Sequence, residues 1–126
     1  MMSGRQFSRI EYKMIATFMY NDKKYDGRIH NLSMKGMLLE TGLKIPQGEE
    51  LSVKIRLSSL STESTVDIKT ARVVRSTEEG VALEFEKIEL DSFILLRNIM
   101  IYNSGDSDKI DSEYRNYIKH RNRKKS

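Results

Sequence analysis

Two arginines, Arg5 and Arg9, lie four residues apart in the segment RQFSR, which precedes the first apolar strand pattern of the chain. A guanidinium group is always charged, and its rigid fork of N–H donors suits phosphates, carboxylates and paired acceptor atoms. A short polar leader of this kind does not form a packed core, so the two side chains do not serve as core residues. We therefore interpret them as candidate ligand-binding groups.

A second polar segment, NLSMKG at residues 31–36, follows the second strand pattern. Asn31 and Ser33 are two residues apart, and at a strand end this spacing puts both side chains on one face of the sheet. Gly36 stands where a tight turn would take a positive φ before the next strand. From the residues alone, the segment is either a polar β-turn or part of a binding site.

The remaining reactive side chains do not indicate an enzyme. His30 and His120 have no companion at metal-ligand spacing, and His30 lies within a predicted strand as a wall residue. The acidic pairs at 49–50 and 78–79 lie in predicted turns as ordinary solvated charges. The chain contains no glycine-rich phosphate loop and no Ser/His/Asp motif. We predict a protein without catalytic activity and without a metal or cofactor.

The composition indicates a single domain of a cytosolic protein. At 126 residues with 38% hydrophobic residues, the chain is long enough to bury a core without cross-links. It has no cysteine, which excludes a disulfide scaffold and thiolate metal sites and fits a reducing compartment. No run of about 18 apolar residues is present, and no apolar signal segment precedes the first strand pattern. We predict a cytoplasmic location and no transmembrane segment.

The positive charge is concentrated at the C-terminus. The chain has 22 basic and 18 acidic residues, and the last eight residues, KHRNRKKS, contain five of the basic ones and no acid. The rest of the chain is therefore nearly neutral. This tail either keeps the protein soluble or forms an arm that binds a polyanion.

Six segments have the pattern of β-strands. Residues 51–57 (LSVKIRL) alternate apolar and polar side chains, and residues 65–76 repeat the alternation over part of their length. Gly27 marks a possible bulge, and Pro46 is expected at the second position of a type I turn. The spacing of the strands predicts an antiparallel barrel or sandwich whose strands are 11–20, 24–32, 36–41, 51–57, 65–76 and 81–85.

The hydrophobic period changes after the last predicted strand. Apolar positions between 90 and 101 form a broad helical stripe, which the segment NSGDSD interrupts. Ile110, Tyr114, Tyr117 and Ile118 then recur with helical spacing. We predict a first helix that covers an open end or face of the barrel. A second helix is expected to dock on the first helix or on another subunit.

The two polar segments together resemble the signature of the PilZ domain family, which is RxxxR in an N-terminal leader followed some twenty residues later by (D/N)xSxxG. In this chain the two motifs are RQFSR at 5–9 and NLSMKG at 31–36. The turn IPQGEEL, the segment GVALEF and a C-terminal helix also match the family pattern. The resemblance covers about residues 4–102.

PilZ domains are bacterial receptors for cyclic di-GMP built on a six-stranded β-barrel, so the resemblance implies that fold and that ligand here. It divides the chain into a flexible leader at 1–10, a mainly β, six-stranded antiparallel PilZ-type barrel at 11–88, C-terminal α-helices at 89–121 and a basic tail at 122–126. The protein would change conformation when the leader closes on the ligand, and it would signal to a protein partner. It would act as a monomer or homodimer.

The resemblance also implies roles for five residues. Arg5 and Arg9 would clamp guanine edges and phosphates, and an extended chain between them spans at most about 13–14 Å, so they reach different parts of one ligand or of a stacked pair. Asn31 would accept a guanine N–H, and Ser33 would bond a phosphate or a base edge. Gly36 would let the turn backbone approach the ligand closely.

Two positions depart from the common family pattern. Gly4 stands where many members carry another arginine before RxxxR, and this favours one bound ligand over a stacked pair. Asn31 stands where many members have an aspartate. A neutral acceptor gives up a charge-assisted bond to guanine, so the expected affinity is modest.

Two other functions remain open from the sequence. The chain could be a small-barrel nucleic-acid-binding protein that uses the basic tail, or an adaptor whose second helix mediates assembly without a ligand. Nucleic acid is the less favoured partner, because the body is nearly neutral and its strands lack a dense basic and aromatic surface. Binding through the tail would fade with salt and with deletion of residues 119–126, whereas a guanine-reading site would survive both changes but not loss of Arg9.

Overall fold

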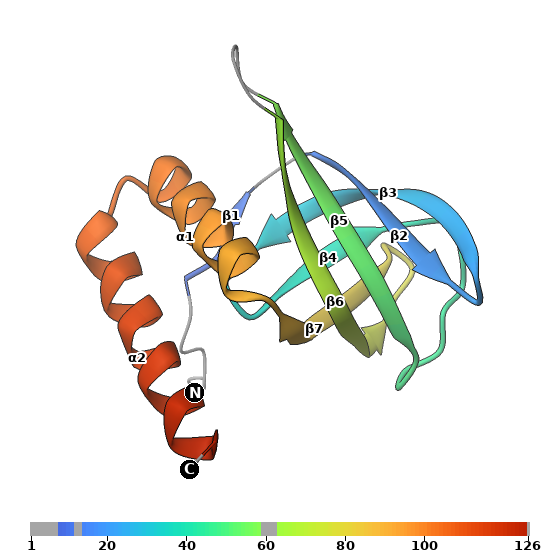
Figure 1. Cartoon of the computed structure of the whole chain (residues 1–126). Helices are drawn as coiled ribbons and strands as arrows, with labels where there is room; N and C mark the ends of the chain where they lie inside the picture. The colour runs from blue at the N-terminus through green and yellow to red at the C-terminus, as the bar shows by residue number, and fades with distance from the viewer. Residues whose placement is uncertain (1–7, 12–13, 59–62, 126) are drawn as a thin grey trace.

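The computed structural model describes residues 8–11, 14–58 and 63–125, which form a β-barrel followed by two helices (Figure 1). Every predicted strand and helix is present, with β1 and β2 together in place of the single strand predicted at 11–20. In chain order the elements are β1 (Ile10–Glu11), β2 (Ile15–Tyr20), β3 (Lys23–Leu32), β4 (Gly36–Glu40), β5 (Glu50–Ser58), β6 (Glu63–Ser76), β7 (Val81–Ile88), α1 (Leu90–Ser104) and α2 (Ser107–Lys125).

Six strands form a closed antiparallel ring. Their hydrogen-bonded order is β3-β2-β5-β6-β7-β4, and a further β3–β4 pairing joins the two ends of this order. The six-stranded antiparallel barrel is therefore confirmed, and the alternative of a two-sheet sandwich is excluded. The short strand β1 also pairs with β3, where Ile10 lies opposite Leu32. Since Ile15 of β2 lies opposite Arg28, β1 and β2 run end to end along the same side of β3.

Alternate side chains of the strands fill the barrel. On β5, Leu51, Val53 and Ile55 are buried while Lys54 and Arg56 are exposed, as the alternation of residue types predicts. Burying one such aliphatic side chain contributes about 1.5–3 kcal/mol relative to leaving it exposed. The register of the strand is fixed for this reason, because a shift of one residue would expose the whole apolar set.

The turn before β5 differs from the sequence prediction. The N–H of Glu49 donates to the carbonyl of Pro46 at 3.3 Å, so Pro46 is the first residue of the turn rather than the second. Gly48 is then the third residue, and its φ is +94°. A type II turn requires a positive φ at this position, which accounts for the glycine.

Gly27 is not the site of a bulge. It pairs with Ala16 in a regular register, and the pairing of β3 with β4 shifts instead between Ile29 and Asn31. A Cβ on Gly27 would lie 2.9 Å from Cδ1 of Leu39, so the glycine makes room for a core side chain of the neighbouring strand. The sequence shows the glycine but not the neighbour that requires it.

Helix α1 packs against β6 and β1, and it buries Phe93 and Met100 (Figure 1). The hydroxyl of Ser92 accepts the N–H of Asp67 on β6 at 2.9 Å, which fixes the first turn of the helix against the barrel. The helix ends at Gly105, whose φ of +73° is the left-handed conformation of a common C-terminal cap. The predicted cover for the barrel is thus provided by α1.

Helix α2 packs on α1 within the same chain. Ile110 is buried, and the ring of Tyr114 stacks on Phe93 with centroids 5.3 Å apart. The Nε of Arg97 on α1 donates to a carboxylate oxygen of Asp111 on α2 at 2.7 Å. Of the two partners predicted for this helix, α1 is the one it contacts here. Neither helix, over the residues that the structure describes, is long and apolar enough to cross a membrane.

Candidate ligand-binding site

The turn between β3 and β4 is organised by one hydroxyl group. The Oγ of Ser33 accepts the N–H groups of Lys35 and Gly36, both at 3.1 Å, and donates to the carbonyl of Gly36 at 3.3 Å. The N–H of Ser33 donates to the same carbonyl at 2.9 Å. One donor and two acceptor sites are all that a serine hydroxyl has, so its capacity is fully used within the turn. Only 7% of the residue is exposed.

Gly36 is required by a close approach rather than by its φ angle. A Cβ at this position would lie 2.1 Å from the carbonyl oxygen of Leu83 on β7. The described glycines with positive φ are elsewhere, so the predicted left-handed conformation of Gly36 is wrong. The carbonyl of Lys35 also accepts the N–H of Phe85 at 2.8 Å. The turn is therefore pressed onto β7 as well as closed by Ser33.

Asn31 lies at the end of β3, between two paired strands. It is opposite Glu11 of β1 on one side and Leu38 of β4 on the other. The residue is half-buried, and its side-chain amide forms no hydrogen bond with another described residue. Within the part of the chain that the structure describes, its oxygen and its two N–H donors thus have no partner. The prediction that strand alternation puts Ser33 on the same face of the sheet as Asn31 does not apply, because β3 ends at Leu32 and Ser33 belongs to the turn.

Arg9 reaches the same corner of the barrel from the leader. It directly precedes Ile10, which pairs with Leu32, so the antiparallel register brings Arg9 level with Ser33. The Arg9 side chain is exposed and has no ion pair with any described residue. The structure thus brings together Arg9, Asn31 and the Ser33–Gly36 turn. Arg5 and Gly4 lie outside the described residues.

The leader is attached to helix α2 next to Arg9. The Ser8 hydroxyl donates to Oε2 of Glu113 at 2.8 Å, and the Ser8 N–H is 3.1 and 3.2 Å from the two carboxylate oxygens. Ile10, two residues on, is buried. From Ser8 onward, the leader that was predicted to be flexible therefore contacts both the barrel and α2. Nothing in the sequence near Glu113 indicated this contact.

A second arginine on the barrel wall near the turn has its charge balanced. Arg72 of β6 lies opposite Glu84 of β7, which in turn lies opposite Gly36. The guanidinium of Arg72 is 3.4 Å from a Glu84 oxygen and 3.0 Å from a Glu86 oxygen. This arginine is offset by two carboxylates, so Arg9 is the better placed of the two cations to receive an anionic ligand.

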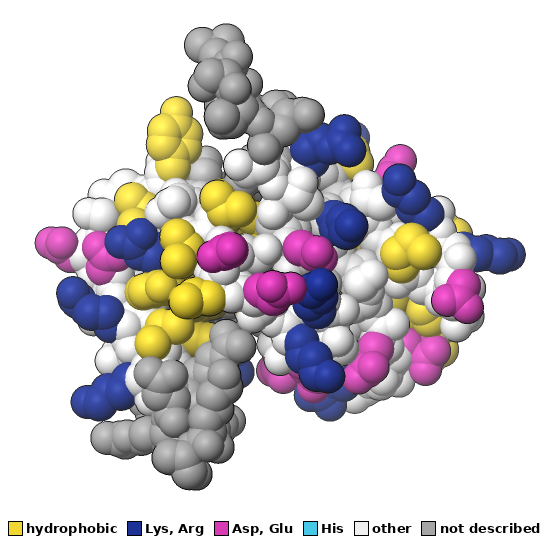
Figure 2. Space-filling view, viewed as in Figure 1, with side chains coloured by type: hydrophobic (Ala, Val, Ile, Leu, Met, Phe, Trp, Pro, Cys, Tyr) yellow, Lys and Arg dark blue, Asp and Glu magenta, His cyan; other side chains and the backbone are white. Residues whose placement is uncertain are grey.

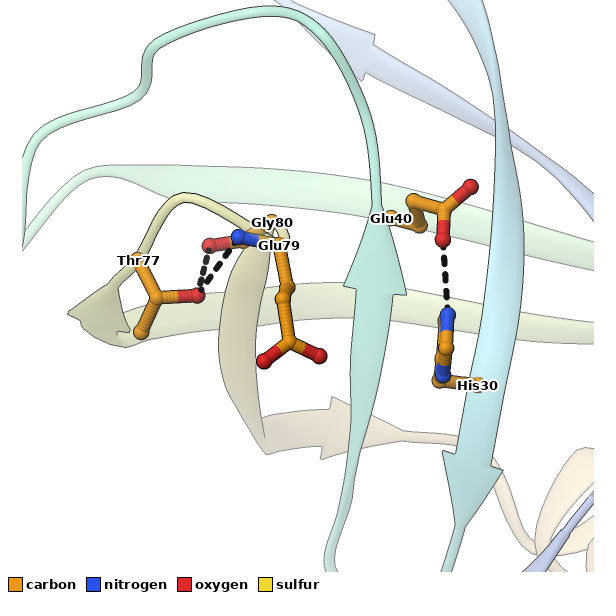
Figure 3. A network of polar contacts seen from close by, with 5 residues as sticks. All are labelled: His30, Glu40, Thr77, Glu79 and Gly80. Carbon is orange, nitrogen blue, oxygen red and sulfur yellow. Dashed lines mark hydrogen bonds and ion pairs between the residues drawn. The ribbon is translucent and has the colours of Figure 1, made fainter.

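His30 occupies the outer wall of the barrel, as predicted. Its Nε2 lies 2.6 Å from Oε2 of Glu40 on the neighbouring strand β4 (Figure 3). The described part of the chain contains no group of three or more His, Cys, Asp or Glu side chains that could bind a metal ion. The histidine therefore belongs to a surface pair of polar groups.

A turn of the same construction closes the β6–β7 hairpin. The Oγ1 of Thr77 accepts the N–H of Glu79 at 3.2 Å and donates to the carbonyl of Gly80 at 3.2 Å (Figure 3). The N–H of Thr77 also donates to that carbonyl, at 2.8 Å. Sequence reasoning missed this similarity, although SMKG and TEEG share the spacing of a hydroxyl residue and a glycine.

The sequence matches the PilZ domain over residues 3–102, which is most of the chain. It belongs to the PilZ domain family. Among curated protein sequences, none matches this chain. The family match includes both polar segments of the candidate site, and it confirms the resemblance on which the predicted ligand rests.

Solved structures share the PilZ fold of this chain. The inhibitor of motility from Bacillus subtilis, MotI/DgrA, has a TM-score of 0.68 and 21% identity over 80% of this chain, which spans only 51% of that protein. The PilZ domain of YcgR from Escherichia coli, solved with c-di-GMP, has a TM-score of 0.62 and 13% identity, covering 81% of this chain and 92% of that one. The PilZ domain of CeSA from a cellulose-synthesising bacterium has a TM-score of 0.55 and 16% identity, covering 73% and 93%.

Proposed function

We propose that this PilZ protein is a cytoplasmic, non-enzymatic receptor for cyclic di-GMP. The observation that carries the proposal is the exposed Arg9 beside the Asn31 amide, both without a partner among the described residues, next to the rigid Ser33–Gly36 turn. The structure of the YcgR PilZ domain with c-di-GMP supports this ligand by analogy. The ligand has two guanines and two phosphates, and both groups suit arginine.

Each site residue has a distinct task in this proposal. The Arg9 guanidinium binds a guanine O6/N7 edge or a phosphate, and Arg5 of the same motif supplies the second guanidinium. The Asn31 oxygen accepts a guanine N–H. Ser33 acts mainly through the turn, because its hydroxyl has no free capacity while the turn is closed. Gly36 keeps the turn backbone flat against β7 and free of a side chain that would shield it.

The leader transmits the binding event in this proposal. Ser8, immediately beside Arg9, donates both its hydroxyl O–H and its backbone N–H to the carboxylate of Glu113. When Arg9 turns toward a ligand on the barrel, the backbone at Ser8 moves with it and the Glu113 contact changes. Ligand binding at the barrel thereby alters how the leader sits on α2, which a protein partner can recognise.

Calorimetric titration with cyclic di-GMP tests the proposal, with GTP as a control ligand. Wild type should bind selectively, and Arg9→Ala should lose about 1–3 kcal/mol, or roughly 5- to 150-fold in affinity. Asn31→Ala should lose roughly 2- to 10-fold, as expected of one neutral hydrogen bond. Arg115→Ala is the matched control, because Arg115 is an exposed arginine on α2. Wild type that does not bind at about 1 mM ligand would overturn the proposal.

Hydrogen exchange separates leader closure from binding alone. Cyclic di-GMP should change the exchange of the amides at residues 8–11 in wild type but not in Arg9→Ala. A variant that lacks residues 119–126 should keep both responses, because the basic tail has no part in the proposed site. Equal loss of binding on deleting the tail would favour the polyanion-binding alternative instead.

A further inference from the structure

The outer face of β2 carries apolar side chains where a barrel normally presents polar ones. Ile15 is 54% exposed, Met19 is 40% exposed and Met14, just before the strand, is 39% exposed. The solvated face of an antiparallel strand usually alternates to polar residues. Two of these positions, Ile15 and Met19, lie four residues apart on β2, so they form the apolar ends of a column about 13 Å long, which we call the apolar column.

Basic residues border this column on both neighbouring strands. Ile15 lies opposite Arg28 of β3 and level with Arg56 of β5, since the next residue, Ala16, pairs with Ile55. Met19 lies opposite Lys24 of β3. The register therefore places cations beside both ends of the apolar column.

The middle of the column is polar and mixed in charge. Thr17 lies between Asp26 of β3 and Lys54 of β5, and its hydroxyl donates to the Asp26 carboxylate at 3.4 Å. Among the residues that the structure describes, none of the four cations around the column takes part in an ion pair; these are Lys24, Arg28, Lys54 and Arg56. Figure 2 shows yellow apolar side chains on the barrel bordered by dark blue Lys and Arg and by some magenta Asp and Glu side chains.

The surface is hollowed at this point. An open depression of about 690 Å³ is lined by residues of β2, β3 and β5, which are Met14, Ile15, Thr17, Lys24, Tyr25, Asp26 and Arg56. Exposed Met and Arg side chains are enriched at protein interfaces, and unpaired Arg at a partly apolar hollow is typical of a binding anchor. The concave shape suits a protruding partner better than a flat bilayer surface.

We infer that this β2 face is a docking surface for an acidic amphipathic helix of a partner protein. Strand addition is excluded, because β2 is already bonded to β3 on one side and β5 on the other. A helix presents apolar side chains two turns apart at about 11 Å, close to the length of the apolar column. Its Asp and Glu residues would meet the four cations of this face, which form no ion pair with any residue that the structure describes.

Other occupants fit less well. The chain's own α2 carries basic residues throughout its second half, so like charges would meet if it docked on a second copy. Single-stranded nucleic acid binds through bases stacked on exposed aromatic rings. The ring of Tyr25 is instead stacked on Phe18 with centroids 5.4 Å apart, and the exposed side chains of the column are Ile and Met.

Synthetic helical peptides of about 18 residues provide the probe. Three peptides share one apolar face and carry Glu, Gln or Lys on the polar face. In fluorescence anisotropy with the full chain, the Glu peptide should bind at least tenfold more tightly than the Gln peptide, and the Lys peptide should not bind. Amide shifts in NMR spectra should map the bound Glu peptide to β2 and β5.

Matched variants distinguish specific binding at the β2 face from nonspecific binding of the peptide elsewhere on the barrel. Ile15→Ser and Arg56→Glu should each weaken the Glu peptide at least tenfold, while Val74→Ser and Arg75→Glu on β6 should leave it unchanged. Val74 is 39% exposed and Arg75 is exposed, so both controls resemble the tested positions. All four positions are solvent-exposed, and a thermal melt confirms that each variant folds.

Four outcomes would overturn the inference. The three peptides could bind equally, or the β6 controls could weaken binding as much as the β2 variants. An oligonucleotide could displace the Glu peptide with Ile15→Ser having no effect, which would identify a polyanion site. Sedimentation could show a wild-type dimer that Ile15→Ser dissociates, which would identify a second copy as the occupant. The test does not involve cyclic di-GMP, so its result is independent of the proposed receptor function.

Discussion

Two turns of similar construction stand at opposite ends of the β4–β7 pair. In one, Ser33 closes on the carbonyl of Gly36, and in the other, Thr77 closes on the carbonyl of Gly80. A Cβ on either glycine would lie 2.1 Å from a carbonyl oxygen of the neighbouring strand, that of Leu83 or Leu39 respectively. The hydroxyl-x-x-glycine spacing is therefore a way of pressing a tight turn onto a paired strand.

The surroundings of the two turns are different. Beside Ser33 lie the cations Arg9 and Lys35 and the free amide of Asn31. The other turn contains two exposed glutamates at 78–79, which would repel an anionic ligand. The comparison shows that the serine and glycine of the family motif specify backbone shape. In the proposed site, the groups that would bind an anion are instead the residues beside the turn.

The two glycines should give the largest effects. Gly36→Ala should destabilise the fold by about 2–3 kcal/mol, because backbone of β7 must move to admit the methyl group. Gly80→Ala should cost at least as much, since Gly80 has the same clash and a φ of +148° that alanine rarely adopts. Urea unfolding measures both. Gly42→Ala is the control and should stay within about 0.5 kcal/mol, because nothing lies within 4 Å of its Cβ.

The two hydroxyl residues should differ in cost. Ser33→Ala leaves two N–H groups of a buried turn without an acceptor, so it should cost about 1–3 kcal/mol. Thr77→Ala should cost under about 1 kcal/mol, because Thr77 is exposed and water can replace its hydroxyl. Thermal melts of the two variants check the difference. Equal losses of stability would show that burial of the Ser33 turn does not make its hydroxyl more important than that of Thr77.

Asn31→Asp sharpens the comparison by changing only the binding chemistry. A carboxylate would accept a guanine N–H in a charge-assisted bond, so affinity for cyclic di-GMP should rise by about 1 kcal/mol, or roughly fivefold. Stability should fall by less than about 1 kcal/mol, because the new acidic residue lies opposite Glu11 of β1. Calorimetry measures the affinity. An unchanged or lower affinity would mean that Asn31 does not face a guanine edge.

Glu113→Ala should lower stability by only about 0.5–1 kcal/mol, because the carboxylate is partly exposed and, among the residues that the structure describes, its hydrogen bonds go to Ser8. The amides at residues 8–11 should nevertheless exchange faster, since the leader loses its hydrogen bonds to α2. Exchange monitored by mass spectrometry tests this. As a control, Ser112→Ala at the exposed residue before Glu113 should leave the exchange rates of the same amides unchanged.

Much of the barrel was predictable from the sequence, because a strand with one buried face must alternate. Leu51, Val53 and Ile55 show this alternation and are all buried. The resemblance to the family also located Arg9 and Asn31, which the fold brings to one corner. These are properties of local pattern, which a sequence displays directly.

What the sequence could not supply depends on distant neighbours. The glycine at 36 is required by Leu83, 47 positions later in the sequence, and the glycine at 27 by Leu39. Ser33 was expected to bond a ligand directly, whereas its hydroxyl forms its hydrogen bonds inside the turn, and residue spacing does not reveal this. Such contacts exist only after the barrel has closed, so local patterns do not contain them.

The contact between Ser8 and Glu113 joins residues 105 positions apart, and it has a consequence for the order of folding. During synthesis the leader is made well before its partner on α2. The barrel can close and the Ser33 turn can form before Glu113 exists. The leader therefore makes its contact with Glu113 only after α2 has been made, and a protein truncated before α2 would have a complete barrel whose leader lacks this contact.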